Sequence, residues 1–192
     1  WGSTRVVARA YHPRKPNTRY FDTNPVINGF DTFEIRIPKM PKEVLVDVYN
    51  EANGNQEQDS TVGIGNITVH KLRPYITNMM DNTVNSFATF SDDFAENAGI
   101  ISATNSIYLS PCGRFRIDYK DVIRDDKGNE LRTPARINSE TKIIEIAKKY
   151  YINYTVPGRK AINWHEFSHI YRNVNKSNEI EADKNAIMIY LG

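Results

Sequence analysis

The sequence predicts an α+β fold in which a β-rich part precedes a helical last third. Three observations predict it. Alternating apolar and charged residues recur in short stretches between residues 33 and 137, which is the period of half-buried strands. Turn-forming residues separate these stretches, and from residue 138 onward the apolar residues take the spacing of amphipathic helices. We therefore expect a single domain over residues 33–192, with a β-rich part at 33–137 and a helical part at 138–192.

Residues 1–32 are expected to form an extended N-terminal arm outside this domain. Proline and glycine bias the backbone toward extended and turn conformations at four dipeptides: His12-Pro13, Lys15-Pro16, Asn24-Pro25 and Asn28-Gly29. Basic residues cluster in the arm without an acid before Asp22: Arg5, Arg9, Arg14, Lys15 and Arg19. We interpret the arm as a solvated basic segment, and the alternative is a docking segment for an acidic protein partner.

Strands are predicted in the β-rich part at 33–37, 43–49 and 62–72, with a polar loop at 53–60. A hairpin is expected over residues 107–119, and a second turn at 126–129 precedes a short extended piece near Leu131.

One helix is expected within the β-rich part, with Asp81 as its N-cap. Its apolar residues follow at spacings of three, three and four, which places them on one face: Val84, Phe87, Phe90 and Phe94. We interpret this stripe as part of the hydrophobic core.

Three helices are predicted in the last third. The first follows Ser139 as its N-cap and runs to Tyr151, after which an extended segment ends at Pro157-Gly158. The second runs from about Ala161 to Tyr171 and the third from about Asn178 to Leu191.

Composition argues against several classes of function. The 25 basic and 23 acidic residues leave a net charge of +2, which does not indicate a nucleic-acid or acidic-membrane partner. The single cysteine, Cys112, excludes an intramolecular disulfide and favours an intracellular or virion-associated protein. No stretch approaches the roughly 18 apolar residues of a membrane span, so we expect a soluble protein. Gly63-Ile64-Gly65 lacks the third glycine of a dinucleotide-binding loop.

The segment His165-Glu166-Phe167-Ser168-His169 has the pattern His-Glu-x-x-His. The two imidazoles lie four residues apart, one helical turn, so both can bind one metal ion. Glu166 projects about 100° around the helix from His165, where it can hold a metal-bound water as a general base. The alternative is a pair of structural histidines on an ordinary helix.

Glu179 is the predicted third ligand, because a catalytic zinc takes three protein ligands and leaves one position to water. Asn178 as N-cap, with Glu181 three residues later, forms a capping box that begins a helix beside the end of the previous one. Asp183 lies one turn after Glu179 and can accept a proton from a ligand imidazole. If Glu179 is instead a solvated helix start, Asp183 or Glu181 is the alternative ligand.

Together, His165–His169 and the Glu-x-x-Ala-Asp element at Glu179–Asp183 resemble the gluzincin-type zinc metallopeptidases, and in particular small bacterial and phage-encoded zincins. The second element is shared with HtpX-like and prenyl-protein membrane peptidases. The resemblance covers about the last 35 residues, and the gap from His169 to Glu179 is shorter than in the membrane peptidases. It implies a zincin-like domain that binds Zn²⁺, with Glu179 as the third ligand and Asp183 supporting the site.

The expected activity is hydrolysis of peptide bonds by a zinc-bound water that Glu166 activates. Tyr171 and Tyr154, with Arg172 also near in sequence, are candidate stabilisers of the oxyanion. The substrate is expected to be a peptide or protein that adds as a strand to a sheet edge. The alternative is a structural or assembly protein, for example of a phage particle, that keeps a zincin-like domain while its arm binds a neighbouring subunit.

Overall fold

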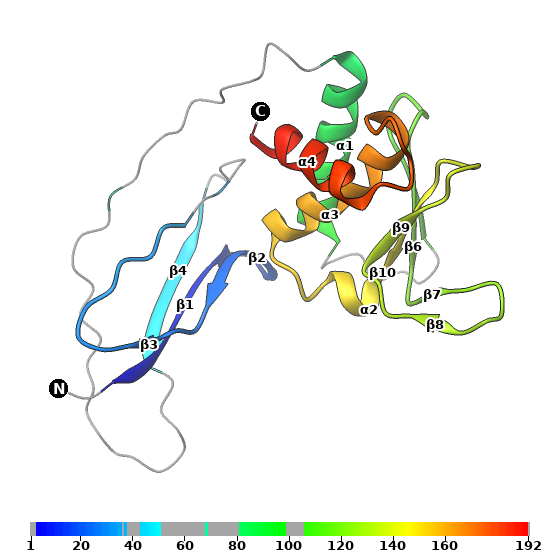
Figure 1. Cartoon of the computed structure of the whole chain (residues 1–192). Helices are drawn as coiled ribbons and strands as arrows, with labels where there is room; N and C mark the ends of the chain where they lie inside the picture. The colour runs from blue at the N-terminus through cyan, green and yellow to red at the C-terminus, as the bar shows by residue number, and fades with distance from the viewer. Residues whose placement is uncertain are drawn as a thin grey trace. The chain divides into compact units, whose positions relative to one another are not determined.

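The computed structural model describes residues 3–35, 37, 43–50, 68, 81–98 and 106–191 of the chain. These residues form both helices and sheets, which confirms the predicted α+β class. The chain divides into two compact units, Trp1–Leu72 and Arg73–Gly192 (Figure 1). The division therefore lies about 40 residues after the boundary predicted at residue 32.

The first unit contains an antiparallel sheet built around its first strand, which pairs with the three others. Its strands are β1 (Thr4–His12), β2 (Lys15–Thr23), β3 (Val26–Ile27) and β4 (Leu45–Asn50). The predicted extended arm is thus wrong, because most of it is paired in this sheet. Its prolines mark turns and an edge strand, and Arg9 and Arg19 form ion pairs with Asp22.

The predicted strand at Phe33–Ile37 is not formed, because residues 33–35 and 37 have no regular secondary structure. Phe33 instead packs its ring edge-on against Phe21 of β2, with 6.5 Å between ring centroids. The predicted strand at 43–49 is confirmed by β4. The predicted loop at 53–60, the strand at 62–72 and the Gly63-Ile64-Gly65 segment fall outside the described residues, except for residue 68.

The second unit packs helices against one face of a mixed sheet of order β5-β6-β10-β9, in which only β6 and β10 are parallel. A separate short hairpin pairs β7 with β8. The elements are α1 (Asn82–Asn97), β5 (Ser106–Leu109), β6 (Arg116–Lys120), β7 (Ile123–Arg124), β8 (Glu130–Leu131), β9 (Ala135–Ile137), β10 (Ile144–Ala147), α2 (Lys148–Tyr151), α3 (Val156–Tyr171) and α4 (Glu179–Leu191).

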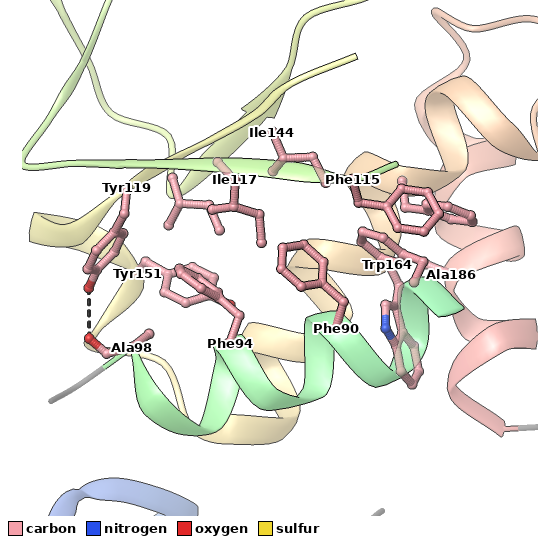
Figure 2. Packing of buried hydrophobic residues seen from close by; sticks show 14 of the residues in the cluster. Phe90, Phe94, Ala98, Phe115, Ile117, Tyr119, Ile144, Tyr151, Trp164 and Ala186 are labelled. Atoms are coloured by element: carbon pink, nitrogen blue, oxygen red, sulfur yellow. Dashed lines mark hydrogen bonds between the residues drawn. The ribbon is translucent and has the colours of Figure 1, made fainter. Parts of the chain in front are cut away.

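The core of this unit lies between α1, α3 and the sheet (Figure 2). Asp81 caps α1 as predicted, since its carboxylate accepts the Val84 N–H at 2.9 Å. The predicted stripe of α1 is buried: Val84, Phe87, Phe90 and Phe94. Phe94 packs edge-on against Tyr119 of β6, whose hydroxyl donates to the Ala98 carbonyl. The predicted hairpin at 107–119 and the turn before Leu131 are confirmed.

The predicted helix from Ser139 to Tyr151 is wrong over most of its length. Residues 144–147 instead form β10, whose Ile144 and Ile146 point into the core, and only residues 148–151 are helical. The reason is a pairing between distant parts of the chain, because β10 joins β6 in parallel and β9 in antiparallel register. The extended segment predicted from Tyr150 to Val156 is also wrong, because residues 150–151 end α2, residues 152–154 form a turn and α3 begins at Val156, before the predicted start near Ala161.

Helix α3 is central to the second unit, because it contacts α1, α4, β9 and β10 (Figure 1). Buried polar residues fix its rotation against α1. The Arg159 guanidinium donates to the Ala95 carbonyl, the Lys160 ammonium pairs with Asp92 at 3.2 Å, and Asn163 donates to Ser91. Within the described part of the chain, none of the helices combines the length and apolar character needed to cross a membrane.

Candidate metal centre

The His-Glu-x-x-His segment lies on the last two turns of α3, as predicted. His165 is half-buried and His169 is buried. Their Nε2 atoms are 3.0 Å apart, because the spacing of four residues places both rings on one face of the helix. The next helix, α4, begins at Glu179, and its Oε2 atom lies 3.0 Å from His165 Nε2 and 3.4 Å from His169 Nε2. The three predicted ligand side chains therefore converge.

The other nitrogen of each ring has its own partner. His169 Nδ1 lies 2.7 Å from the carbonyl oxygen of Lys176, and His165 Nδ1 lies 2.8 Å from Asp183 Oδ1. A carbonyl and a carboxylate only accept, so each Nδ1 carries the hydrogen. In the neutral rings both Nε2 atoms then present lone pairs toward Glu179 Oε2. Asp183 thus occupies the supporting position that the sequence predicted.

These three ligand atoms have a spacing that suits a small divalent cation. Ligands at about 2.0–2.1 Å from a tetrahedral zinc lie about 3.3 Å from one another. The observed separations are 3.0, 3.0 and 3.4 Å. Three electron-rich atoms at this spacing repel one another, and a cation between them removes that repulsion. Imidazole and carboxylate are donors that zinc accepts, so His165, His169 and Glu179 could hold it.

Glu166 follows His165 but is directed toward the sheet. The backbone of Ile137 in the edge strand β9 lies near its carboxylate and favours the charged form. Burial raises the pKa of Glu166 above its ordinary value, against the opposing effect of the two histidines. A half-buried carboxylate on the residue after His165 could accept a proton, and its role as a general base stays a prediction.

The burial of Glu166 makes a prediction for the metal-free chain. The folded chain holds the Glu166 proton more tightly than the unfolded chain. The protonated side chain therefore contributes to the stability of the fold below the ordinary pKa of glutamate. This contribution is lost as the pH rises through the raised pKa of the folded state. Glu166→Gln should therefore melt at a higher temperature than wild type at pH 7 with a chelator present, and the difference should narrow toward pH 4.5. Glu140→Gln, on an exposed turn residue, is the control. Equal melting temperatures of Glu166→Gln and wild type at pH 7 would contradict the assignment.

The connection from α3 to α4 confirms one half of the predicted capping box. Asn178 accepts the Glu181 N–H at 3.1 Å, as an N-cap does. The Glu181 carboxylate does not return to Asn178 but accepts the N–H groups of Val174 and Asn175, at 2.7 and 3.3 Å. Glu181 therefore holds the connection rather than acting as the alternative ligand.

The three candidate oxyanion stabilisers have other contacts. Tyr171 is about 200° around the helix from His169 and stacks on Phe167, with ring centroids 4.6 Å apart. Tyr154 precedes the start of α3, which lies about 14 Å along the helix axis from His165. Arg172 lies 3.4 Å from Asp81. The geometry thus gives Tyr171, Tyr154 and Arg172 no role beside the ligand atoms.

Two groups at the site were missed by sequence reasoning, namely the Lys176 carbonyl and the backbone of Ile137 near Glu166. Both are backbone groups, which every non-proline residue carries, so no residue type signals them. A comparison of the chain with models of protein families, with curated proteins and with solved structures found no match. The function is therefore argued from the residues of this chain.

Proposed function

We propose that the second unit is a zinc-dependent peptidase with a zincin-like fold, in which His165, His169 and Glu179 bind the ion and Glu166 is the general base. The observation that carries the proposal is the convergence of the three ligand atoms within 4.8 Å of one another. A mixed sheet packed on the helix that bears the His-Glu-x-x-His segment supports the same class.

The cluster has the character of a catalytic rather than a structural zinc site. Structural zinc sites are closed by four protein ligands, whereas catalytic ones keep a position open for water. Over the described residues, the cluster contains three such side chains. The Glu179 side chain is 72% exposed, so the site opens to solvent on the side of α4. A purely structural site would also have no use for a half-buried acid such as Glu166.

A bound zinc ion supplies Lewis acidity, which lowers the pKa of a water molecule and polarises a carbonyl group. The residues of the chain supply the remaining steps. The Glu166 carboxylate takes a proton from the attacking water and returns it to the leaving amine. Asp183 and the Lys176 carbonyl orient the two imidazoles.

The edge strand β9 supports a peptide as the substrate. Its hydrogen bonds to the β10 side include the Pro134 carbonyl and the Asn138 N–H, so the alternate residues Ala135 and Ile137 direct their backbone groups outward. Ile137 is also the residue whose backbone lies near the Glu166 carboxylate. An extended peptide that pairs with this edge would therefore pass the general base.

Cleavage of an unfolded general protein substrate tests the proposal. The full chain should cleave it when loaded with zinc, lose the activity with a chelator and regain it when zinc is restored. A zinc-loaded chain that cleaves neither unfolded proteins nor peptide libraries would overturn the proposed activity and favour the structural or assembly alternative.

Asp183 should tune the affinity of the site for zinc without being a ligand. Asp183→Asn removes the charge that fixes His165 Nδ1, and loss of such a partner weakens metal binding by about 10- to 100-fold. Competition with a chromophoric chelator measures the effect. Lys184→Ala, at the neighbouring exposed position, should bind zinc as wild type does. An unchanged affinity in Asp183→Asn would remove this residue from the site.

A further inference from the structure

The connection between α3 and α4, residues 172–178, contains one buried side chain. Asn173 is 9% exposed, whereas the other residues of the connection are exposed. Burial of an amide among exposed neighbours is costly unless its polar groups are all bonded. The hydrogen bonds that Asn173 makes therefore indicate why its side chain is buried.

Asn173 is bonded to α4 and the connection through its side chain and to α3 through its backbone. Its Nδ2 donates to the Asn178 carbonyl at 2.9 Å and to the Asn175 carbonyl at 3.4 Å. Its Oδ1 accepts from Asn185 Nδ2 at 2.9 Å, two turns into α4. Its backbone N–H donates to the Ser168 carbonyl at 2.8 Å, in the last turn of α3.

Two of these points, Ser168 and Asn178, are immediate neighbours of the candidate ligands. Ser168 precedes His169, and Asn178 precedes Glu179 and caps α4. Lys176, whose carbonyl fixes His169 Nδ1, lies between the two carbonyls that Asn173 holds. We infer that Asn173 is a positioning residue: its backbone is bonded to the end of α3 and its side chain holds the start of α4, which sets the distance between Glu179 and the histidines and keeps the Lys176 carbonyl on His169. This inference rests on the proposed function.

The chemistry of asparagine suits this position. The amide offers two hydrogens to two carbonyls and one oxygen to a donor, which matches the three side-chain bonds observed. Aspartate offers acceptors only and would face two carbonyls without a hydrogen between them. Alanine would leave both carbonyls without this partner.

The affinity of the full chain for Zn²⁺, measured by competition with a chromophoric chelator, tests the inference. Asn173→Ala should weaken binding by about 10- to 100-fold, the range found for residues that orient metal ligands. The visible absorption of the Co²⁺-loaded chain should change as well, because the ligand geometry changes. Tyr151→Phe is the matched control: it removes a buried hydroxyl that bonds Arg159 and Asn163 near the start of α3. It should lower the melting temperature and leave both metal readouts unchanged.

If Asn173→Ala does not fold, Asn185→Ala removes one of the three side-chain bonds and should give a smaller weakening in the same direction. The inference is overturned if the folded variant binds Zn²⁺ as tightly as wild type with the same Co²⁺ spectrum, or if Tyr151→Phe weakens binding equally. In both cases the proposed function stands. A wild-type chain without Zn²⁺ affinity overturns the proposed function and this inference together.

Discussion

Glu166→Gln should lower the rate of peptide hydrolysis by about 10³-fold while the chain still binds zinc. General base catalysis contributes between about 10² and 10⁴ to a rate, and glutamine cannot accept the proton. The amide nevertheless has the size and shape of the carboxylate. The substitution therefore removes the chemistry and keeps the packing. The measurements are kcat on a peptide substrate and the zinc content of the same sample.

Glu140→Gln, on an exposed turn residue, provides the matched control and should cleave at the wild-type rate. The outcome that argues against the assignment is a Glu166→Gln variant that keeps full activity with one zinc bound. Loss of zinc together with activity would instead place Glu166 among the ligands.

Glu179→Ala should abolish tight zinc binding and with it the stabilisation of the fold by zinc. Two imidazoles without the carboxylate leave the ion two protein ligands, whereas catalytic zinc sites have three. In wild type, zinc at 1,000 times its dissociation constant should add about 4 kcal/mol to the free energy of unfolding. The metal-free variant should melt close to wild type, because the Glu179 side chain is 72% exposed.

Melting temperatures with and without zinc check this prediction. Wild type should shift upward on addition of zinc and Glu179→Ala should not. Ile180→Ala, on the exposed neighbour in α4, should shift as wild type does. A Glu179→Ala variant that retains the full zinc-dependent shift would show that another group is the third ligand.

The candidate site could be predicted from the sequence because local rules determine most of its geometry. The spacing of His165 and His169 follows from the period of one helix. Glu179 could be placed because Asn178 begins the next helix immediately before it. The position of Asp183 beside His165 Nδ1 followed from one further helical turn.

The errors in the fold arose where pairing partners are distant in the sequence. Ile143, Ala147 and Tyr150 have the spacing of a helix face, whereas Ile144 and Ile146 have that of a strand, and the parallel partner β6 decided for the strand. Residues 4–12 were predicted as part of an extended arm, but they form β1, which pairs with both β2 and β4. The local sequence of β1 does not reveal these partners. Tyr171 was proposed from its position in the sequence, but its side of α3 faces Phe167 and Phe115.

Anomalous diffraction at the zinc absorption edge, from a crystal of the zinc-loaded chain, tests the central claim most directly. We expect a single strong peak in the second unit, at about 2.0–2.1 Å from His165 Nε2, His169 Nε2 and a carboxylate oxygen of Glu179. A zinc-loaded crystal with no peak at that point, or with Glu179 directed away from it, would contradict the claim that these three side chains bind one ion.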